Sequence, residues 1–252
     1  MQTDMTVGKP MKMLLNFTIP VFLGNVFQQL YSMADAVIVG KFVGTKGLAA
    51  VGATGTITFL IIGFLMGVTT GVTVLTSQKF GAGRMDEMRK TVGNAAILSA
   101  VIAVVMTAVS MLGMHRLLVF MHTPEDIFDG AYGYIMIICA GIFTQVLYNL
   151  VSSILRALGN SKTPLYFLIL AAGLNIVLDL VFIIFFHWGA PGAAWATVIS
   201  QGVSGVLCLI YMWKAVPELK MKKEDWYFNR DIAVKQISVG IPMGLQYSIT
   251  AI

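Results

Sequence analysis

Long stretches without a charged side chain constrain the fold of this chain more than any other feature. A helix needs about 20 apolar residues to cross the hydrocarbon core of a bilayer. Five stretches reach that length, and only Asp179 interrupts the last of them: 13–34, 47–78, 91–115, 130–155 and 163–213. Overall, 57% of the residues are hydrophobic and 12% are charged, a balance typical of membrane proteins. The sequence therefore predicts an all-α, polytopic membrane protein with the lipid bilayer as its solvent.

The last stretch is long enough for two spans, and the Trp, Gly and Pro residues of 187–192 suit a turn at the membrane interface between them. Six transmembrane helices are therefore predicted: 14–39, 48–76, 92–114, 131–155, 165–186 and 193–213. A further apolar run begins after Lys235. We expect an N-terminal six-helix lobe over 1–213, a cytoplasmic loop over 214–235 and the truncated start of a seventh helix over 236–252.

The loop charges predict the orientation of these helices. Of the 17 Lys and Arg residues, 14 fall on one side of the predicted membrane, beginning with Lys9 and Lys12. The opposite side has Lys41, Lys46 and Arg116. Because basic loops stay in the cytoplasm, the N-terminus is predicted to be cytoplasmic, in a multi-pass protein of the cell membrane.

A weak internal repeat suggests a second lobe. Residues 241–245 share Ile, Pro and Leu with residues 19–23 at matching positions, and both segments follow basic residues. Such an offset fits two six-helix repeats in the same orientation. We therefore expect one lobe of a two-lobe protein, whose C-terminal lobe is missing from this chain.

Two acids lie inside predicted helices, Asp35 in the first and Asp179 in the fifth. An ionisable group inside the bilayer is costly unless it is hydrated or paired, so its default interpretation is functional. Counting from the outer helix ends at about 1.5 Å per residue places both acids in the outer half of the bilayer. A carboxylate shielded from water can exchange a proton, and with further oxygen ligands it can hold Na⁺. The alternatives are a misplaced helix end for Asp35 and a structural polar contact for Asp179.

Polar residues at helical spacing accompany these acids on four helices. They predict one cavity open to the outside, lined by Gln28, Tyr31, Tyr134, Gln145, Asn149 and Gln201. Asn175 lies one turn from Asp179, and Thr197 begins a polar stripe that continues through Ser200, Gln201 and Ser204. Helix-packing contacts are the alternative for such small polar faces. Pro20 removes a backbone hydrogen bond in the first helix and is either a static kink or a hinge that responds to Asp35.

Other chemistries find little support in the sequence. Cys139 and Cys208 lie in apolar runs with no partner at metal-ligand spacing, and the three histidines lie at helix ends. We therefore expect no enzyme and no cofactor. The net charge of +5 is spread over short loops rather than gathered in one stripe, so a nucleic-acid partner is not expected either.

Two segments of the sequence are the most characteristic: 24–40, which contains Gly24, Asn25 and Asp35, and 174–179, which contains Asn175 and Asp179. They resemble bacterial drug/cation antiporters of the multidrug and toxic compound extrusion family. Three further segments are similar: 48–52, 78–83 and 155–164. The resemblance covers the whole chain.

This resemblance implies a cation site for H⁺ or Na⁺ at Asp35, Asn175, Asp179 and Thr197, with the backbone carbonyl of Ala193 as a further ligand. It also implies that Tyr134 lies near that site and that the first helix bends at Pro20. The implied function is alternating-access efflux of lipophilic, often cationic small molecules in exchange for the cation. A related two-lobe family that moves lipid-linked sugars, and a six-helix scaffold or channel subunit that oligomerises, remain as alternatives.

Overall fold

The computed structural model describes residues 10–249, and within that range the chain is helical with no strand. The eight α-helices are α1 (Pro10–Phe42), α2 (Thr45–Gly81), α3 (Met85–Phe120), α4 (Glu125–Ala140), α5 (Ile142–Ala157), α6 (Lys162–Leu180), α7 (Gly189–Ala215) and α8 (Arg230–Ile249). A π-helical turn, η1 (Val181–Phe185), extends α6, and two short 3₁₀ turns, η2 (Pro217–Leu219) and η3 (Lys223–Trp226), precede α8.

The predicted all-α membrane fold is confirmed. Five helices in the described range are long and apolar enough to span a bilayer, and α4 with α5 forms a sixth span if the bent pair is counted as one. The helices α1, α2, α3 and α7 extend beyond their predicted bounds at both ends. The predicted bounds stopped before the basic residues that flank these helices, whereas Lys, Arg and Glu continue a helix readily once it leaves the hydrocarbon.

The fourth predicted span, 131–155, is not one straight helix, and the prediction was wrong on this point. It breaks at Gly141 with a bend of 47° between α4 and α5. A Cβ atom at Gly141 would lie 2.2 Å from Cγ2 of Val198 on α7, so only glycine allows α7 to approach this closely. The bend follows from a helix contact that the sequence of one helix does not reveal.

The fifth predicted span, 165–186, also differs from the prediction, since its last turn is the π-helical η1 rather than α-helix. The chain then reverses through His187 and Gly189, both with positive φ, and enters α7. The rings of Phe182 and Trp188 stack at 5.0 Å across this reversal.

The helix predicted as the seventh span is α8. It begins at Arg230, six residues before its predicted start at 236, so the predicted loop 214–235 is shorter in the structure. The side chain of Asn229 caps the helix, because its Oδ1 accepts hydrogen bonds from the backbone N–H groups of Asp231 and Ile232 at 2.9 and 3.2 Å. The predicted end of this segment, 250–252, and Lys9 lie outside the described residues.

Glycines bring α8 into close contact with α2. A Cβ atom on Gly67 would lie 2.4 Å from the carbonyl oxygen of Met243, and one on Gly71 would lie 2.5 Å from Cα of Gly240. Gln236 is fully buried and donates to the carbonyls of Val72 and Thr91, on α2 and α3, at 3.0 and 2.8 Å. These contacts hold α8 against α2.

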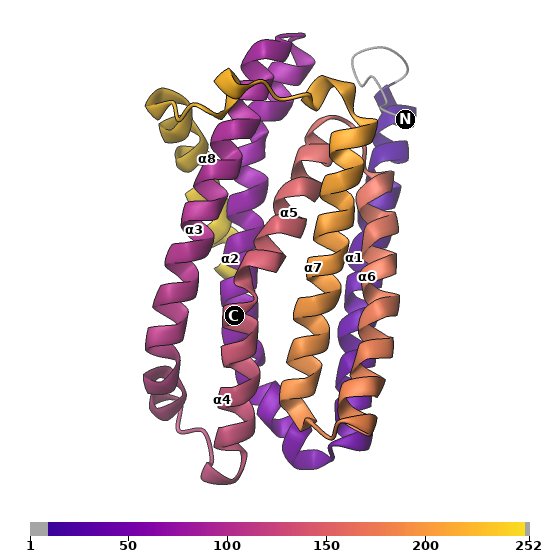
Figure 1. Ribbon diagram of the computed structural model, residues 1–252, viewed down its shortest axis with the longest axis vertical. Coiled ribbons are helices and arrows are strands. Elements are labelled where there is room, and N and C mark those ends of the chain that lie inside the picture. The colour runs from indigo at the N-terminus through magenta and orange to yellow at the C-terminus, as the bar shows by residue number, and fades with distance from the viewer. Residues whose placement is uncertain (1–9, 250–252) are drawn as a thin grey trace.

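Two groups of helices face each other across the bundle. α1, α6 and α7 pack together on one side, α2, α3 and α8 pack on the other, and α4 and α5 connect them (Figure 1). The connection from α2 to α3 and the segment between α7 and α8 lie at the same end of the bundle (Figure 1). This end carries most of the basic residues, and the prediction that it faces the cytoplasm stays a prediction.

Candidate functional site

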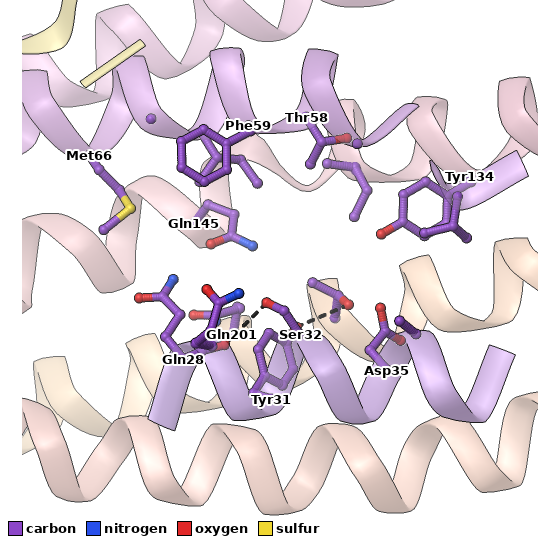
Figure 2. A pocket seen from close by; sticks show the side chains of 18 of the residues that line it. Gln28, Tyr31, Ser32, Asp35, Thr58, Phe59, Met66, Tyr134, Gln145 and Gln201 are labelled. Carbon is purple, nitrogen blue, oxygen red and sulfur yellow. Dashed lines mark hydrogen bonds between the residues drawn. The ribbon is translucent and has the colours of Figure 1, made fainter. Parts of the chain in front are cut away.

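A cavity of about 580 Å³ lies between α1 and α2 and is completed by residues of α4, α5, α7 and α8. Five of the six predicted cavity residues line it: Gln28, Tyr31, Tyr134, Gln145 and Gln201. Figure 2 shows Gln28, Tyr31, Ser32 and Asp35 along one wall, with Thr58, Phe59, Met66 and Tyr134 across from them. Of the four helices predicted to line one cavity, the first, fourth and sixth do so, whereas the lining includes no described residue of the fifth, α6.

The two intramembrane acids meet at the wall of this cavity. Asp35 lines the cavity and is 9% exposed, whereas Asp179 is fully buried behind it. Their carboxyl groups are close enough to share a hydrogen bond, which requires a proton on one of them. The pair therefore joins α1 to α6 through a buried contact between two carboxyl groups.

Asn175 and Thr197 extend this contact to α7. When the Asn175 amide is oriented to satisfy its neighbours, its nitrogen donates to Oδ2 of Asp179 at 3.0 Å and its oxygen accepts from the Thr197 backbone N–H at 3.2 Å. The hydroxyl of Tyr31 on α1 donates to Oγ1 of Thr197 at 3.1 Å. Three helices, α1, α6 and α7, are thus connected through one buried polar cluster, defined by Tyr31, Asp35, Asn175, Asp179 and Thr197.

Several polar atoms at this site have no hydrogen-bond donor or acceptor opposite them. Oδ1 of Asp35 and Oδ1 of Asp179 accept no hydrogen bond from a donor group, and Oγ1 of Thr58 and Oε1 of Gln201 are also unpartnered. No Lys, Arg or His is among the described residues that line the cavity. Because buried polar groups are costly when unpaired, the two carboxyl groups are chemically suited to take up a proton or a small cation.

The structure places three other predicted residues away from the cavity. Asn149 is half-buried and does not line it, because Gln145 is the last residue of α5 that the cavity reaches and Asn149 lies one turn beyond. Ala193 is fully buried one turn before Thr197. Pro20 is buried in the first half of α1, which continues through it as one helix.

The polar residues predicted as one stripe on α7 have two different roles in the structure. Thr197 and Gln201 line the cavity, whereas Ser204 donates to the Phe167 carbonyl of α6 at 2.6 Å and Ser200 donates to the Thr197 carbonyl at 3.0 Å. The packing interpretation of small polar residues therefore holds for these two serines.

The sequence analysis missed the wall that α2 contributes. Val51, Gly55, Thr58, Phe59, Ile62, Gly63 and Met66 all line the cavity. Their spacing of three and four residues marks one helix face, which is the signal that could have identified them.

The fold and this site define a helical membrane protein with a buried polar cluster inside its bundle. The family model MatE matches residues 20–181, and the chain belongs to this family of membrane transporters. The family resemblance inferred from the sequence is confirmed.

Curated relatives agree with this assignment. The chain is 32% identical to the probable multidrug resistance protein YpnP of Bacillus subtilis over 98% of this chain and 55% of that protein. It is 27% identical to the probable multidrug resistance protein NorM of Thermotoga maritima over 93% of this chain and 51% of that protein. The chain therefore spans about half the length of the curated relatives it matches.

Solved structures of transporters also support the family assignment. A multidrug resistance MATE family transporter of the MOP superfamily, in an outward-facing conformation, matches with a TM-score of 0.89 and 28% identity over 95% of this chain and 53% of that one. A structure described as MATE in the bent conformation matches with a TM-score of 0.87 and 29% identity over 94% of this chain and 53% of that one. The described helices thus share the fold of about half of such a transporter.

Proposed function

We propose that this lobe couples the uptake of a cation, H⁺ or Na⁺, to the efflux of lipophilic, often cationic small molecules in a two-lobe transporter. The observation that supports the proposal most strongly is the pair Asp35 and Asp179, buried, in mutual contact and without a basic partner among the described ion pairs. The relatives named as multidrug resistance proteins support the class of cargo.

The coupling would work through the distance between α1 and α6. With a proton or Na⁺ bound, the two carboxyl groups can stay together beside Asn175 and Thr197. Without it, two negative charges in a medium of low dielectric repel each other much more strongly than they would in water. Cation release would therefore favour separation of α1 from α6 and change the shape of the cavity, whose wall α1 forms.

Pro20 fits a hinge in this mechanism. It lies inside α1, where the backbone hydrogen bond that it lacks lowers the cost of bending the helix. Movement of Asp35 relative to Asp179 would then be accommodated at Pro20, while the rest of α1 stays helical. The Ala193 carbonyl, buried one turn from Thr197, would be an additional ligand if the coupling ion is Na⁺.

The test is efflux of a fluorescent lipophilic cation, ethidium, from vesicles that contain the complete transporter, with an H⁺ or a Na⁺ gradient imposed separately. Asp35→Asn and Asp179→Asn should each reduce gradient-driven efflux to the level of protein-free vesicles, because a neutral amide cannot exchange a cation. The gradient that drives the unaltered protein identifies the coupling ion.

Asp126→Asn is the matched control. Asp126 is an exposed acid at the opposite end of the bundle from the basic loops, and its carboxylate lies 3.6 Å from Lys46 Nζ. This variant should transport as the unaltered protein does. Undiminished coupled efflux in both Asp35→Asn and Asp179→Asn would refute the proposed mechanism.

A further inference from the structure

A second cavity, of about 460 Å³, lies between α3, α5 and α7. Its wall is apolar apart from the buried hydroxyl of Ser99, and it includes Leu219, Met221 and Trp226 from the segment between α7 and α8. Figure 1 looks onto α3, α5 and α7, and α8 lies behind them, packed on α2. The second cavity is therefore on the far side of the bundle from the helix that would lead into a second lobe.

The dimensions of this cavity match one leaflet of a membrane. Along α5 its lining runs from Phe143 to Ile154. Eleven residues of helix correspond to about 16 Å, and half of the hydrocarbon core of a bilayer is about 15 Å. A cavity of this length at one end of a spanning bundle can hold an extended acyl chain over the depth of a single leaflet.

The mouth of the cavity carries the residues expected at a membrane interface. Trp213 and Trp226 line the cavity yet are 73% and 53% exposed. Tryptophan is enriched at the level of the lipid headgroups, where its ring is apolar and its N–H can bind a polar group. An acyl chain that enters between these rings would leave its headgroup beside the segment from α7 to α8.

That segment is basic. Lys214 follows Trp213, Lys220 lies between the lining residues Leu219 and Met221, and Lys222 and Lys223 follow Met221. All four lysines are exposed. Of the three acids nearby, Asp225 is buried and lies 3.7 Å from Nε of Arg89, so its charge is already compensated. The excess of positive charge favours an anionic headgroup.

We propose that this cavity binds one acyl chain of an anionic phospholipid, whose phosphate lies beside Lys214, Lys220, Lys222 and Lys223. The site is separate from the cavity of Asp35 and does not depend on the coupling mechanism. It would hold the segment between α7 and α8 against the membrane surface.

Quenching of tryptophan fluorescence by brominated lipids tests the proposal. The complete protein is placed in phosphatidylcholine vesicles, and a rising fraction is replaced by brominated phosphatidylglycerol or, in parallel, brominated phosphatidylcholine. Half-maximal quenching of the signal from Trp213 and Trp226, obtained by subtracting a Trp213→Phe/Trp226→Phe variant, should need about tenfold less of the anionic lipid. Equal midpoints for the two lipids would overturn the proposal.

Two variants locate the site. Ala96→Phe fills the cavity and should abolish the preference for phosphatidylglycerol, whereas Ala108→Phe, the same change at an exposed position of α3 outside the cavity, should keep it. Replacing the four exposed lysines by Gln should also abolish the preference. Full preference in either the Ala96→Phe or the lysine variant would show that the anionic lipid binds elsewhere.

Discussion

Within residues 10–249, carboxyl groups are buried in two regions, and their surroundings differ. Asp225, between α7 and α8, is 4% exposed, accepts a hydrogen bond from the Lys222 backbone N–H at 2.7 Å and lies near Arg89. Asp35 and Asp179 have each other, an amide and unpartnered oxygens. A buried acid with a basic partner fixes structure, whereas a buried pair that lacks one is available for a mobile cation.

The surroundings of Asp225 support the structural interpretation. A Cβ atom on Gly93 of α3 would lie 2.1 Å from the Asp225 carbonyl oxygen, so the segment lies directly on the helix. Asn94 donates to the Tyr227 carbonyl at 3.3 Å and accepts from the Asn229 backbone N–H at 3.0 Å. These contacts hold the start of α8 in position relative to α3.

The largest expected effect on stability is therefore at Asp225. Asp225→Ala leaves the partly buried Arg89 and the Lys222 N–H without this acceptor, which should lower the free energy of unfolding by about 1–3 kcal/mol. Thermal unfolding in detergent measures the loss. Glu224→Ala, at the exposed neighbouring position, should change stability by less than about 0.5 kcal/mol. Equal melting temperatures for the two variants would show that Asp225 stabilises the fold no more than an exposed acid does.

A smaller effect of opposite sign is expected at the acid pair. Asp35→Asn removes a buried group that can be charged and has no basic partner, so stability should stay the same or rise by up to about 1 kcal/mol, as is common where function demands an unfavourable group. The same thermal measurement applies. A loss as large as that of Asp225→Ala would mean that Asp35 holds the structure together.

The smallest expected effect comes from the edge of the polar cluster. Tyr31→Phe removes only the hydrogen bond to Thr197, which should change the apparent affinity for the coupling cation by about two- to fivefold and leave the maximal rate of efflux nearly unchanged. Efflux measured against cation concentration gives both quantities. Tyr132→Phe, at an α4 residue outside the cavity, should alter neither. Complete loss of coupled efflux in Tyr31→Phe would assign Tyr31 a role as essential as that of the acids.

Much of the site could be predicted because the membrane makes polar residues informative. Asp35 and Asp179 stood out against apolar runs, and the helical spacing of Gln28, Tyr31 and Asp35 placed them on one face. The contribution of Thr58 was missed because a hydroxyl on a glycine-rich helix is equally compatible with packing. Asn149 was misplaced because its spacing gives a direction around the helix axis but not the depth at which the cavity ends.

The sequence by itself determined the all-helical membrane fold and identified the two intramembrane acids, since both depend on the cost of placing a charge or an unpaired backbone group in hydrocarbon. Only the tertiary structure decided where α4 and α5 bend, how α8 lies on α2, and that Asp35 and Asp179 touch. These features depend on which helix approaches Gly141, Gly67 and Gly71, and a glycine permits a close approach without specifying its partner.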